Sequence, residues 1–187
     1  MLDASGPDFE FIGMVLGPLD KLSFLASKLS RREIHMRELS RKRRSETALA
    51  FLEIAYRLYS LYKIVLISIR TQMRDVIWEL RAKMPFAPSK KLRTVCFRAL
   101  AQILLALISR YPVGEIMADR EFEPLWSASG LRLTTYLPDN RLLGLADVLA
   151  WIDNNIARGR WKLDQRYNSL VIRLNVRDRL RSIVGLG

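Results

Sequence analysis

The sequence predicts a mainly α-helical protein: a helical bundle around one long central helix, with a small α+β C-terminal part holding two short strands. Three observations lead to this prediction. The segment 46–83 contains neither proline nor glycine, and its apolar residues cover a wide face at helical spacing. Prolines and a glycine bound a second apolar segment at 89–110. Two later segments instead alternate apolar and polar residues, as half-buried strands do.

The predicted helices follow one another in the first two thirds of the chain. Asp20 is placed to cap a first helix that runs to about Arg44. The helix over 46–83 is expected to form the centre of the bundle, because its wide apolar face needs neighbours on more than one side. Pro85 and Pro88 end this helix. The third helix, over 89–110, is expected to be mostly buried.

The last third of the chain has a different character. A strand is expected over 131–137, a helix over 141–157 and a second strand over 170–176. The predicted organisation is therefore a loose N-terminal lead-in at 1–18, a basic helical core at 19–114, and a smaller α+β segment at 115–187 that packs on the core and ends in a basic tail.

Positive charge dominates the composition. The 187 residues carry 31 Lys and Arg against 19 Asp and Glu, a net charge of +12, and most of the cations are arginine. Such a balance favours anionic partners, namely nucleic acid, an anionic membrane surface or an acidic protein. Arginine binds phosphate through a planar fork and stays charged when half buried. A gene with a biased base composition, or one that overlaps another reading frame, would give the same arginine excess without any such partner.

The cations gather in two groups that we predict to bind nucleic acid or another anion. The first group lies late in the first predicted helix and concentrates charge over a few turns. It consists of Arg31, Arg32, Arg37, Arg41, Lys42, Arg43 and Arg44. The second group lies near the end of the chain and consists of Arg158, Arg160, Lys162, Arg166, Arg177, Arg179 and Arg181. Trp161 and Tyr167 stand among its members, where they would either stack on unpaired bases or belong to the core.

Catalytic and metal-binding patterns are weak. Cys96 and His35 are the single cysteine and the single histidine, too few for a Cys/His metal site. The acidic residues Asp119, Glu121 and Glu123 alternate in an irregular stretch, which is typical of a solvated loop. They are nevertheless the best candidates if the protein is a metal-dependent nuclease. We therefore expect no catalytic residue, no metal site and no cofactor.

One stretch resembles a known family. It runs from Ala87-Pro88-Ser89 through Ile103-Leu104, Leu107-Ile108 and Arg110 to Leu125-Trp126. It resembles the C accessory proteins of morbilliviruses, which are small, basic, helical proteins that modulate the viral polymerase and host defence. The resemblance implies a non-enzymatic accessory role and assigns no residue a function.

The function expected from the sequence is therefore that of a non-enzymatic, basic, helical binding protein that contacts nucleic acid or nucleoprotein through arginine-rich surfaces. The alternative is a viral-type accessory, scaffold or regulatory protein, acting through a protein partner, a homo-oligomer or the surface of an anionic membrane. No segment has the uninterrupted apolar length of a membrane span. A single cysteine and no signal peptide indicate an intracellular location, cytoplasmic or nuclear.

Overall fold

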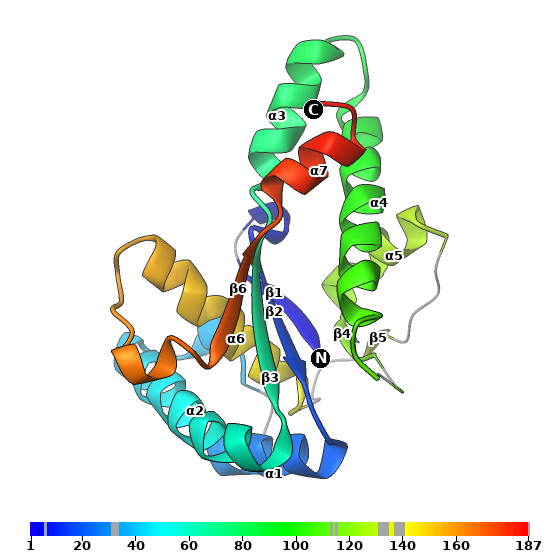
Figure 1. Cartoon of the computed structure of the whole chain (residues 1–187). Coiled ribbons are helices and arrows are strands. Elements are labelled where there is room, and N and C mark those ends of the chain that lie inside the picture. The colour runs from blue at the N-terminus through cyan, green and yellow to red at the C-terminus, as the bar shows by residue number, and fades with distance from the viewer. Residues whose placement is uncertain are drawn as a thin grey trace.

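The computed structural model shows an α/β fold, so the predicted helical bundle is wrong. A mixed β-sheet with strand order β5-β4-β1-β2-β3-β6 lies at the centre, and helices cover both of its faces (Figure 1). The structure describes residues 1–5, 7–30, 34–112, 114, 116–130, 135–136 and 141–186. The strands are β1 (Leu2–Ser5), β2 (Phe11–Leu16), β3 (Val65–Arg70), β4 (Ala118–Asp119), β5 (Thr135–Tyr136) and β6 (Val171–Asn175).

The sheet combines an antiparallel meander with parallel strands at both edges. Strands β1, β2 and β3 pair antiparallel in chain order. Strand β4 pairs parallel to β1, with Leu2 opposite Ala118, and β5 pairs parallel to β4. At the other edge β6 pairs parallel to β3. The first residues of the chain thus lie next to a strand more than a hundred residues away in sequence.

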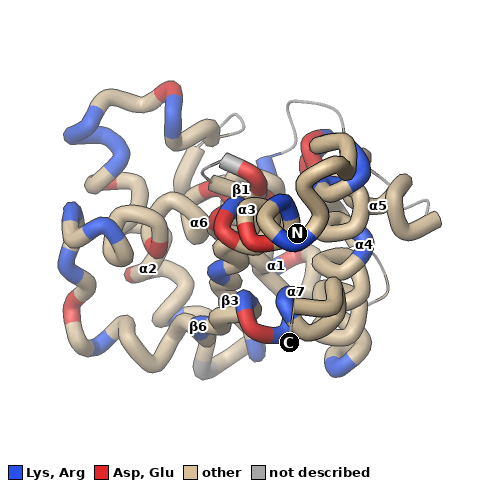
Figure 2. The backbone as a smooth tube through the Cα atoms, turned by 90° about the horizontal axis from the view of Figure 1, so that it is seen from above, with Lys and Arg blue, Asp and Glu red and all other residues tan. Residues whose placement is uncertain are grey.

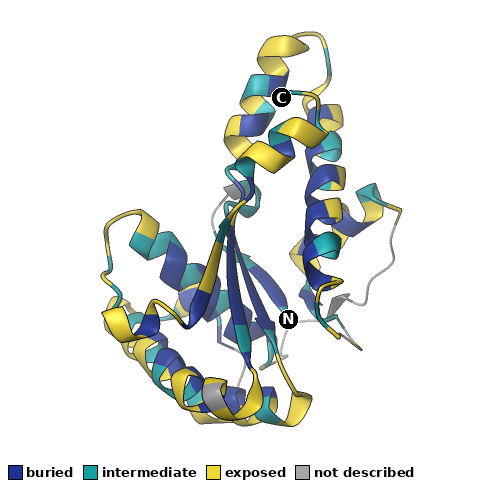
Figure 3. Ribbon diagram, in the orientation of Figure 1, coloured by how far each residue is buried: buried dark blue, intermediate teal, exposed yellow. Residues whose placement is uncertain are grey.

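Two apolar cores hold the helices against the sheet. The helices are α1 (Leu19–Leu29), α2 (Arg41–Tyr62), α3 (Met73–Lys83), α4 (Ser89–Ile108), α5 (Glu123–Ala128), α6 (Leu143–Ala157) and α7 (Arg177–Ile183). One core joins one face of the sheet to α3, α4, α5 and α7, and the other joins the opposite face to α1, α2 and α6. Figure 3 shows the buried residues concentrated along these contacts.

The predicted central helix is broken by a buried strand. Helix α2 ends at Tyr62, and Lys63 then takes a left-handed conformation with φ of 52°. The five residues from Val65 to Ile69 belong to β3, and a second left-handed residue, Gln72 with φ of 49°, precedes α3. A short apolar run that is buried on both faces has no period that separates strand from helix. The two turns use residues other than the glycine that usually marks such a conformation.

The first residues are also not a loose lead-in, because they supply β1 and β2 at the centre of the sheet. The predicted first helix over 20–44 is two helices, since α1 ends at Leu29 and α2 begins at Arg41. The short 3-10 helix η2 (Met36–Glu38) lies between them.

The last third of the chain agrees better with the sequence prediction. Helix α6 matches the helix expected over 141–157, and β6 matches the strand expected over 170–176. Of the strand expected over 131–137, the described part is β5 at Thr135–Tyr136, and the other residues lie outside the description. No helix in the described part of the chain has the length and apolar character needed to cross a membrane.

Candidate functional site

The described part of the first basic group lies in the short helix η2 and in the first turn of α2. Arg31 and Arg32 lie outside the described residues. Arg37 is exposed in η2, and Arg41, Lys42 and Arg43 are exposed in the first turn of α2. Arg44 instead donates hydrogen bonds to the backbone carbonyls of Leu39 and Arg37, both at 2.7 Å, so it holds the connection from η2 to α2.

The placement of these cations is unfavourable for the helix itself. The start of a helix carries partial positive charge, which cations destabilise and anions stabilise. Helix α2 nevertheless has no acidic residue in its first turn, where three exposed cations stand. Lys42 has a partner, Glu46, at 3.9 Å, whereas Arg41 and Arg43 have no ion pair within the described residues. Local helix stability therefore does not account for this group.

The second basic group is divided by the fold. Arg158 pairs with Glu10, and Arg166 pairs with Asp164 and lies against the ring of Tyr167. Tyr167 is buried and donates a hydrogen bond to Glu53 of α2, and Trp161 packs on Trp151. Tyr167 therefore belongs to the core, and the partly buried Trp161 packs against that core.

Helix α7 carries three further members of the second group, Arg177, Arg179 and Arg181, to a different part of the molecule. Arg177 and Arg181 both bind Glu79 of α3, at 2.6 and 2.7 Å, so they fasten α7 to α3. Arg160, Lys162 and Arg179 are exposed and form no ion pair in the described part of the chain. Figure 2 shows that the cations spread over several elements, with one series on the side of the molecule where α2 lies.

Two of the three acidic candidates meet two carboxylates that the sequence analysis did not single out. Asp119 ends β4, Glu121 follows in the short helix η3 (Arg120–Phe122), Asp3 lies on β1 and Asp147 lies on α6. We call these four residues the carboxylate cluster. The third candidate, Glu123, is exposed and pairs with Arg120, outside the cluster.

The sheet register places the cluster. Leu2 lies opposite Ala118 on parallel strands, and both side chains are buried in the core on the α4 side. Since side chains alternate along a strand, the next residues, Asp3 and Asp119, point together to the opposite face. That face is covered by α6, which carries Asp147. The topology thus brings together residues from the beginning, middle and end of the chain.

Hydrogen bonds hold all four carboxylates in place, and Asp119 accepts its own from the backbone N–H of Glu121 at 2.8 Å. The backbone N–H of Ala4 donates to Asp3 at 2.7 Å and to Glu121 at 3.1 Å, and the Asp3 and Glu121 side chains are hydrogen-bonded to each other. Asp147 accepts a hydrogen bond of 2.7 Å from the backbone N–H of Met36. This last bond attaches η2, and the basic group that follows it, to the cluster.

Burial and mutual repulsion raise the pKa values of Asp3, Asp147 and Glu121. Asp3 is only 7% exposed, and burial raises its pKa well above the usual range, with the neighbouring carboxylates raising it further. Burial also raises the pKa of Asp147 to about 6, against the Met36 N–H and the charges of His35 and Arg37, which lower it. Burial of its carboxylate raises the pKa of Glu121, although the residue as a whole is exposed, and the charge of Asp119 raises it further, while the hydrogen bond from the Ala4 N–H lowers it.

The cluster has acidic groups in excess of the cations around it. Among the described residues, no Lys or Arg forms an ion pair with Asp3, Asp119, Glu121 or Asp147. Adjacent carboxylates repel unless a proton or a cation lies between them. Within the described ranges of the chain, no group of three or more His, Cys, Asp or Glu side chains is arranged so that it could hold a metal ion. An Mg²⁺ ion, however, needs only one or two carboxylates, because water and substrate phosphate fill its remaining positions.

Other candidate features lie elsewhere. Cys96 is buried and burial raises its pKa to about 12, so its thiol is inert. The two best-defined surface hollows, about 630 and 650 Å³, are lined mostly by apolar side chains, and neither includes a residue of the cluster.

Asp3 and Asp147 carried a signal that sequence reasoning did not use. Each is a single carboxylate inside an otherwise apolar segment, Leu2–Ala4 and Leu142–Ala150. An acid with no nearby cation at such a position is costly to bury, and so it points to a functional role.

Comparisons with known proteins do not identify the chain. No protein-family description matches it, and neither characterised proteins nor solved structures give a match. The resemblance of residues 87–126 to morbillivirus C proteins gains no support from these comparisons. The function therefore has to be argued from the site itself.

Proposed function

We propose that the protein is a divalent-metal-dependent phosphodiesterase that acts on nucleic acid. The observation that carries the proposal is the convergence of Asp3, Asp119 and Asp147 from two adjacent strands and a covering helix, with raised pKa values for Asp3 and Asp147. This proposal takes up the nuclease alternative expected from the sequence: it keeps Asp119 and Glu121, leaves out Glu123 and adds Asp3 and Asp147.

A cation is the simplest partner for this cluster. Repulsion between Asp3 and its acidic neighbours opposes their ionisation. A proton relieves this repulsion at low pH, whereas at neutral pH a bound Mg²⁺ or Mn²⁺ would do so. Asp3 and Asp119 would hold the ion directly, and Asp147 and Glu121 would bind it through water. Hard oxygen ligands of this kind suit Mg²⁺ and Mn²⁺.

The surroundings favour a phosphate-bearing polymer as the substrate. The charge of Arg37 acts on Asp147, and the exposed cations of α2 follow within a few residues. A polyanion that entered the cluster would therefore meet the first basic group next. The net charge of +12 would attract such a polymer over a longer range.

The proposed reaction is hydrolysis of a phosphodiester. A water molecule adds to phosphorus, and the bond from phosphorus to one bridging oxygen breaks. One proton of the water ends on the leaving oxygen, so the products are a phosphomonoester and a free hydroxyl. The bound ion would neutralise charge on the phosphoryl oxygens and favour ionisation of the attacking water, while the carboxylates would fix the position of the ion.

A cleavage assay tests this proposal. Labelled single- and double-stranded DNA and RNA would be incubated with the purified protein and Mg²⁺, Mn²⁺ or EDTA. We expect metal-dependent cleavage that Asp3→Asn and Asp147→Asn each reduce by at least about 100-fold, since a lost ligand removes several kcal/mol of charge stabilisation. Glu123→Gln is the matched control, because Glu123 is exposed and lies outside the cluster.

The outcomes are distinct. Cleavage that survives both substitutions would exclude the cluster as its source. An inactive protein that still binds nucleic acid in a salt-sensitive manner would favour the non-enzymatic binding function expected from the sequence. The same assay thus separates the two candidate functions.

A further inference from the structure

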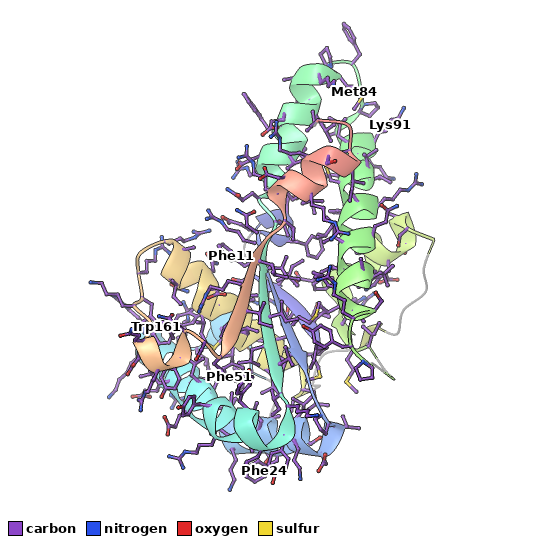
Figure 4. All side chains as sticks on the ribbon, in the orientation of Figure 1. Phe11, Phe24, Phe51, Met84, Lys91 and Trp161 are labelled. Atoms are coloured by element: carbon purple, nitrogen blue, oxygen red, sulfur yellow. The ribbon has the colours of Figure 1, made fainter. Side chains whose placement is uncertain are left out.

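One end of the molecule carries aromatic side chains that nothing in the described chain covers. Helices α3 and α7 and the first half of α4 pack on one another beyond the end of the sheet, and we call them the arm (Figure 1). At the turn from α3 to α4, Phe86 is 100% exposed, and Trp78 on α3 is 72% exposed. Figure 3 shows this turn as exposed, and Figure 4 places Met84 and Lys91 there.

The arm is also strongly basic. Residues 73–91 and 176–186 together contain eight Lys or Arg and three Asp or Glu. Some of these charges serve the arm itself: Arg177 and Arg181 neutralise Glu79, and Lys83 donates a hydrogen bond to the Gly185 carbonyl. Arg81 likewise donates a hydrogen bond to the Ser89 hydroxyl. The exposed cations whose side chains form neither an ion pair nor a hydrogen bond within the described residues are Arg74, Lys90, Lys91 and Arg179. Packing of the arm does not require these four.

We infer that the arm is a second nucleic-acid surface that binds unpaired bases. Trp78 and Phe86 would stack on bases, and Lys90 and Lys91 would contact the phosphates between them. Stacking on aromatic rings together with a basic track is how proteins hold single strands without regard to sequence. The inference rests on the proposed function in one respect, namely that a polynucleotide is what the protein acts on.

Charge and shape favour nucleic acid over a membrane as the occupant. These four cations are spread along the arm and do not form a ring around its exposed apolar residues. Arg74 lies in the first turn of α3 and Arg179 lies on α7. Lys90 and Lys91 lie at the start of α4. A linear polyanion can follow such a track. A membrane would meet mainly Met84 and Phe86, and so small an apolar anchor holds a protein only weakly.

Binding of a fluorescent 20-nucleotide oligothymidylate tests the arm, with EDTA present so that no cleavage occurs. At 0.1 M NaCl we expect Phe86→Ala and Trp78→Ala each to weaken binding about fivefold or more, as the loss of one stacked base does. Reversing two charges with Lys90→Glu and Lys91→Glu should weaken binding and lower the slope of log K against log salt by about 1.4. The controls are Leu61→Ala, which removes an equally exposed apolar side chain from α2, and Arg110→Glu, which reverses one charge beyond the far end of α4.

Unchanged oligothymidylate affinity in the arm variants would overturn the inference. The inference would also be overturned if the arm variants lost only their binding to phosphatidylserine vesicles, because the arm would then be a membrane contact. The two proposals are tested separately by measuring cleavage of a thymidine dinucleotide. This substrate is too short to reach from the cluster to the arm. Arm variants should retain that cleavage, whereas Asp3→Asn should abolish it and leave oligothymidylate binding intact.

Discussion

Gly13 of β2 lies directly under Ala146 of α6. A Cβ atom built on Gly13 would stand 2.1 Å from the Ala146 carbonyl oxygen and 3.0 Å from the Ala150 nitrogen, so only glycine allows the helix to rest on the strand. Gly13 is paired with Asp3 across the β1–β2 register, and Ala146 precedes Asp147. The same close approach therefore brings two members of the carboxylate cluster together.

The first prediction follows from this contact. Gly13→Ala forces α6 away from the sheet, because the obstructing atoms belong to backbone and cannot rotate aside. We expect a loss of about 1–3 kcal/mol in the free energy of unfolding, measured by urea denaturation. The rate of cleavage should fall by more than the loss of folded protein accounts for, since Asp147 moves with the helix. Gly114→Ala, which meets no atom within 4 Å, should leave both quantities unchanged.

The second prediction concerns pH and metal. The pKa of Asp147 rises from its ordinary 3.8 to about 6 on folding, so the folded protein holds this proton more tightly than the unfolded chain. Its contribution to stability is then lost as the pH rises from about 4 through 6, by up to about 3 kcal/mol. Asp3, Asp119, Glu121, His35 and Arg37 are the charged groups that act with it.

The metal-free protein should therefore melt at a higher temperature near pH 5 than near pH 7.5. Millimolar Mg²⁺ or Mn²⁺ should raise the melting temperature at pH 7.5 and have little effect at pH 5, where protons compete for the carboxylates. Differential scanning fluorimetry across this range measures both effects. A melting temperature that rises steadily with pH, and that neither Mg²⁺ nor Mn²⁺ changes, would contradict the inference that the ionised carboxylates repel one another and bind a cation.

The third prediction is that one substitution, Asp3→Asn, raises the stability of the protein and removes its activity. Asp3→Asn keeps an acceptor for the Ala4 N–H and supplies an amide donor to Glu121, as the protonated carboxyl does. Without metal at pH 7.5, we expect this variant to be about 1–2 kcal/mol more stable than the parent. It should also lose both the stabilisation by Mg²⁺ and the cleavage activity. A variant that is simply less stable would indicate that Asp3 is a structural residue.

The sequence predicted local structure well where prolines or a clear alternation of apolar and polar residues marked an element. Pro85, Pro88 and Pro112 bound the segment that forms α4, and alternation at 170–176 marked β6. It failed where the chain turned without glycine or proline, at Lys63 and Gln72, because nothing local distinguishes these residues from helix interior. The strand order could not be predicted for a related reason: β4 pairs with β1, and β6 pairs with β3, across long stretches of sequence, and no single segment specifies such pairing.

Only half of the candidate site could be predicted from the sequence, again because the rest depends on long-range contacts. Asp119 and Glu121 stood out because several acids alternate in one stretch, whereas Asp3 and Asp147 become significant only when the parallel β1–β4 pairing and the α6 contact are known. Conversely, the pairing of Arg177 and Arg181 with Glu79 gives part of the predicted anion surface a structural role that charge counting cannot detect.

The fourth prediction concerns an ion pair in which a buried carboxylate on α6 meets a partly exposed arginine on the edge strand β6. Asp153 is 6% exposed, and Nε of Arg173 on β6 donates to its carboxylate at 2.9 Å. Arg173→Met leaves this carboxylate buried without a partner, and we expect a loss of about 2–4 kcal/mol in urea denaturation at neutral pH. Adding Asp153→Leu should recover much of the loss, because a buried ion pair and an apolar pair of similar volume differ little in stability. No recovery in the double variant would mean that Arg173 contributes through its packing.

The fifth prediction separates the binding role of the α2 arginines from any structural role. Arg41→Glu and Arg43→Glu together place acids at a helix N-terminus, where they interact favourably with the helix dipole, so stability should rise by about 0.5–1 kcal/mol. Affinity for nucleic acid should nevertheless fall about tenfold or more at 0.1 M salt, with a shallower salt dependence. Arg44→Glu should instead lower stability, because it removes the bonds to the Leu39 and Arg37 carbonyls. If the double reversal changes stability but not affinity, the first basic group does not contact nucleic acid, and the polymer must reach the cluster by another path.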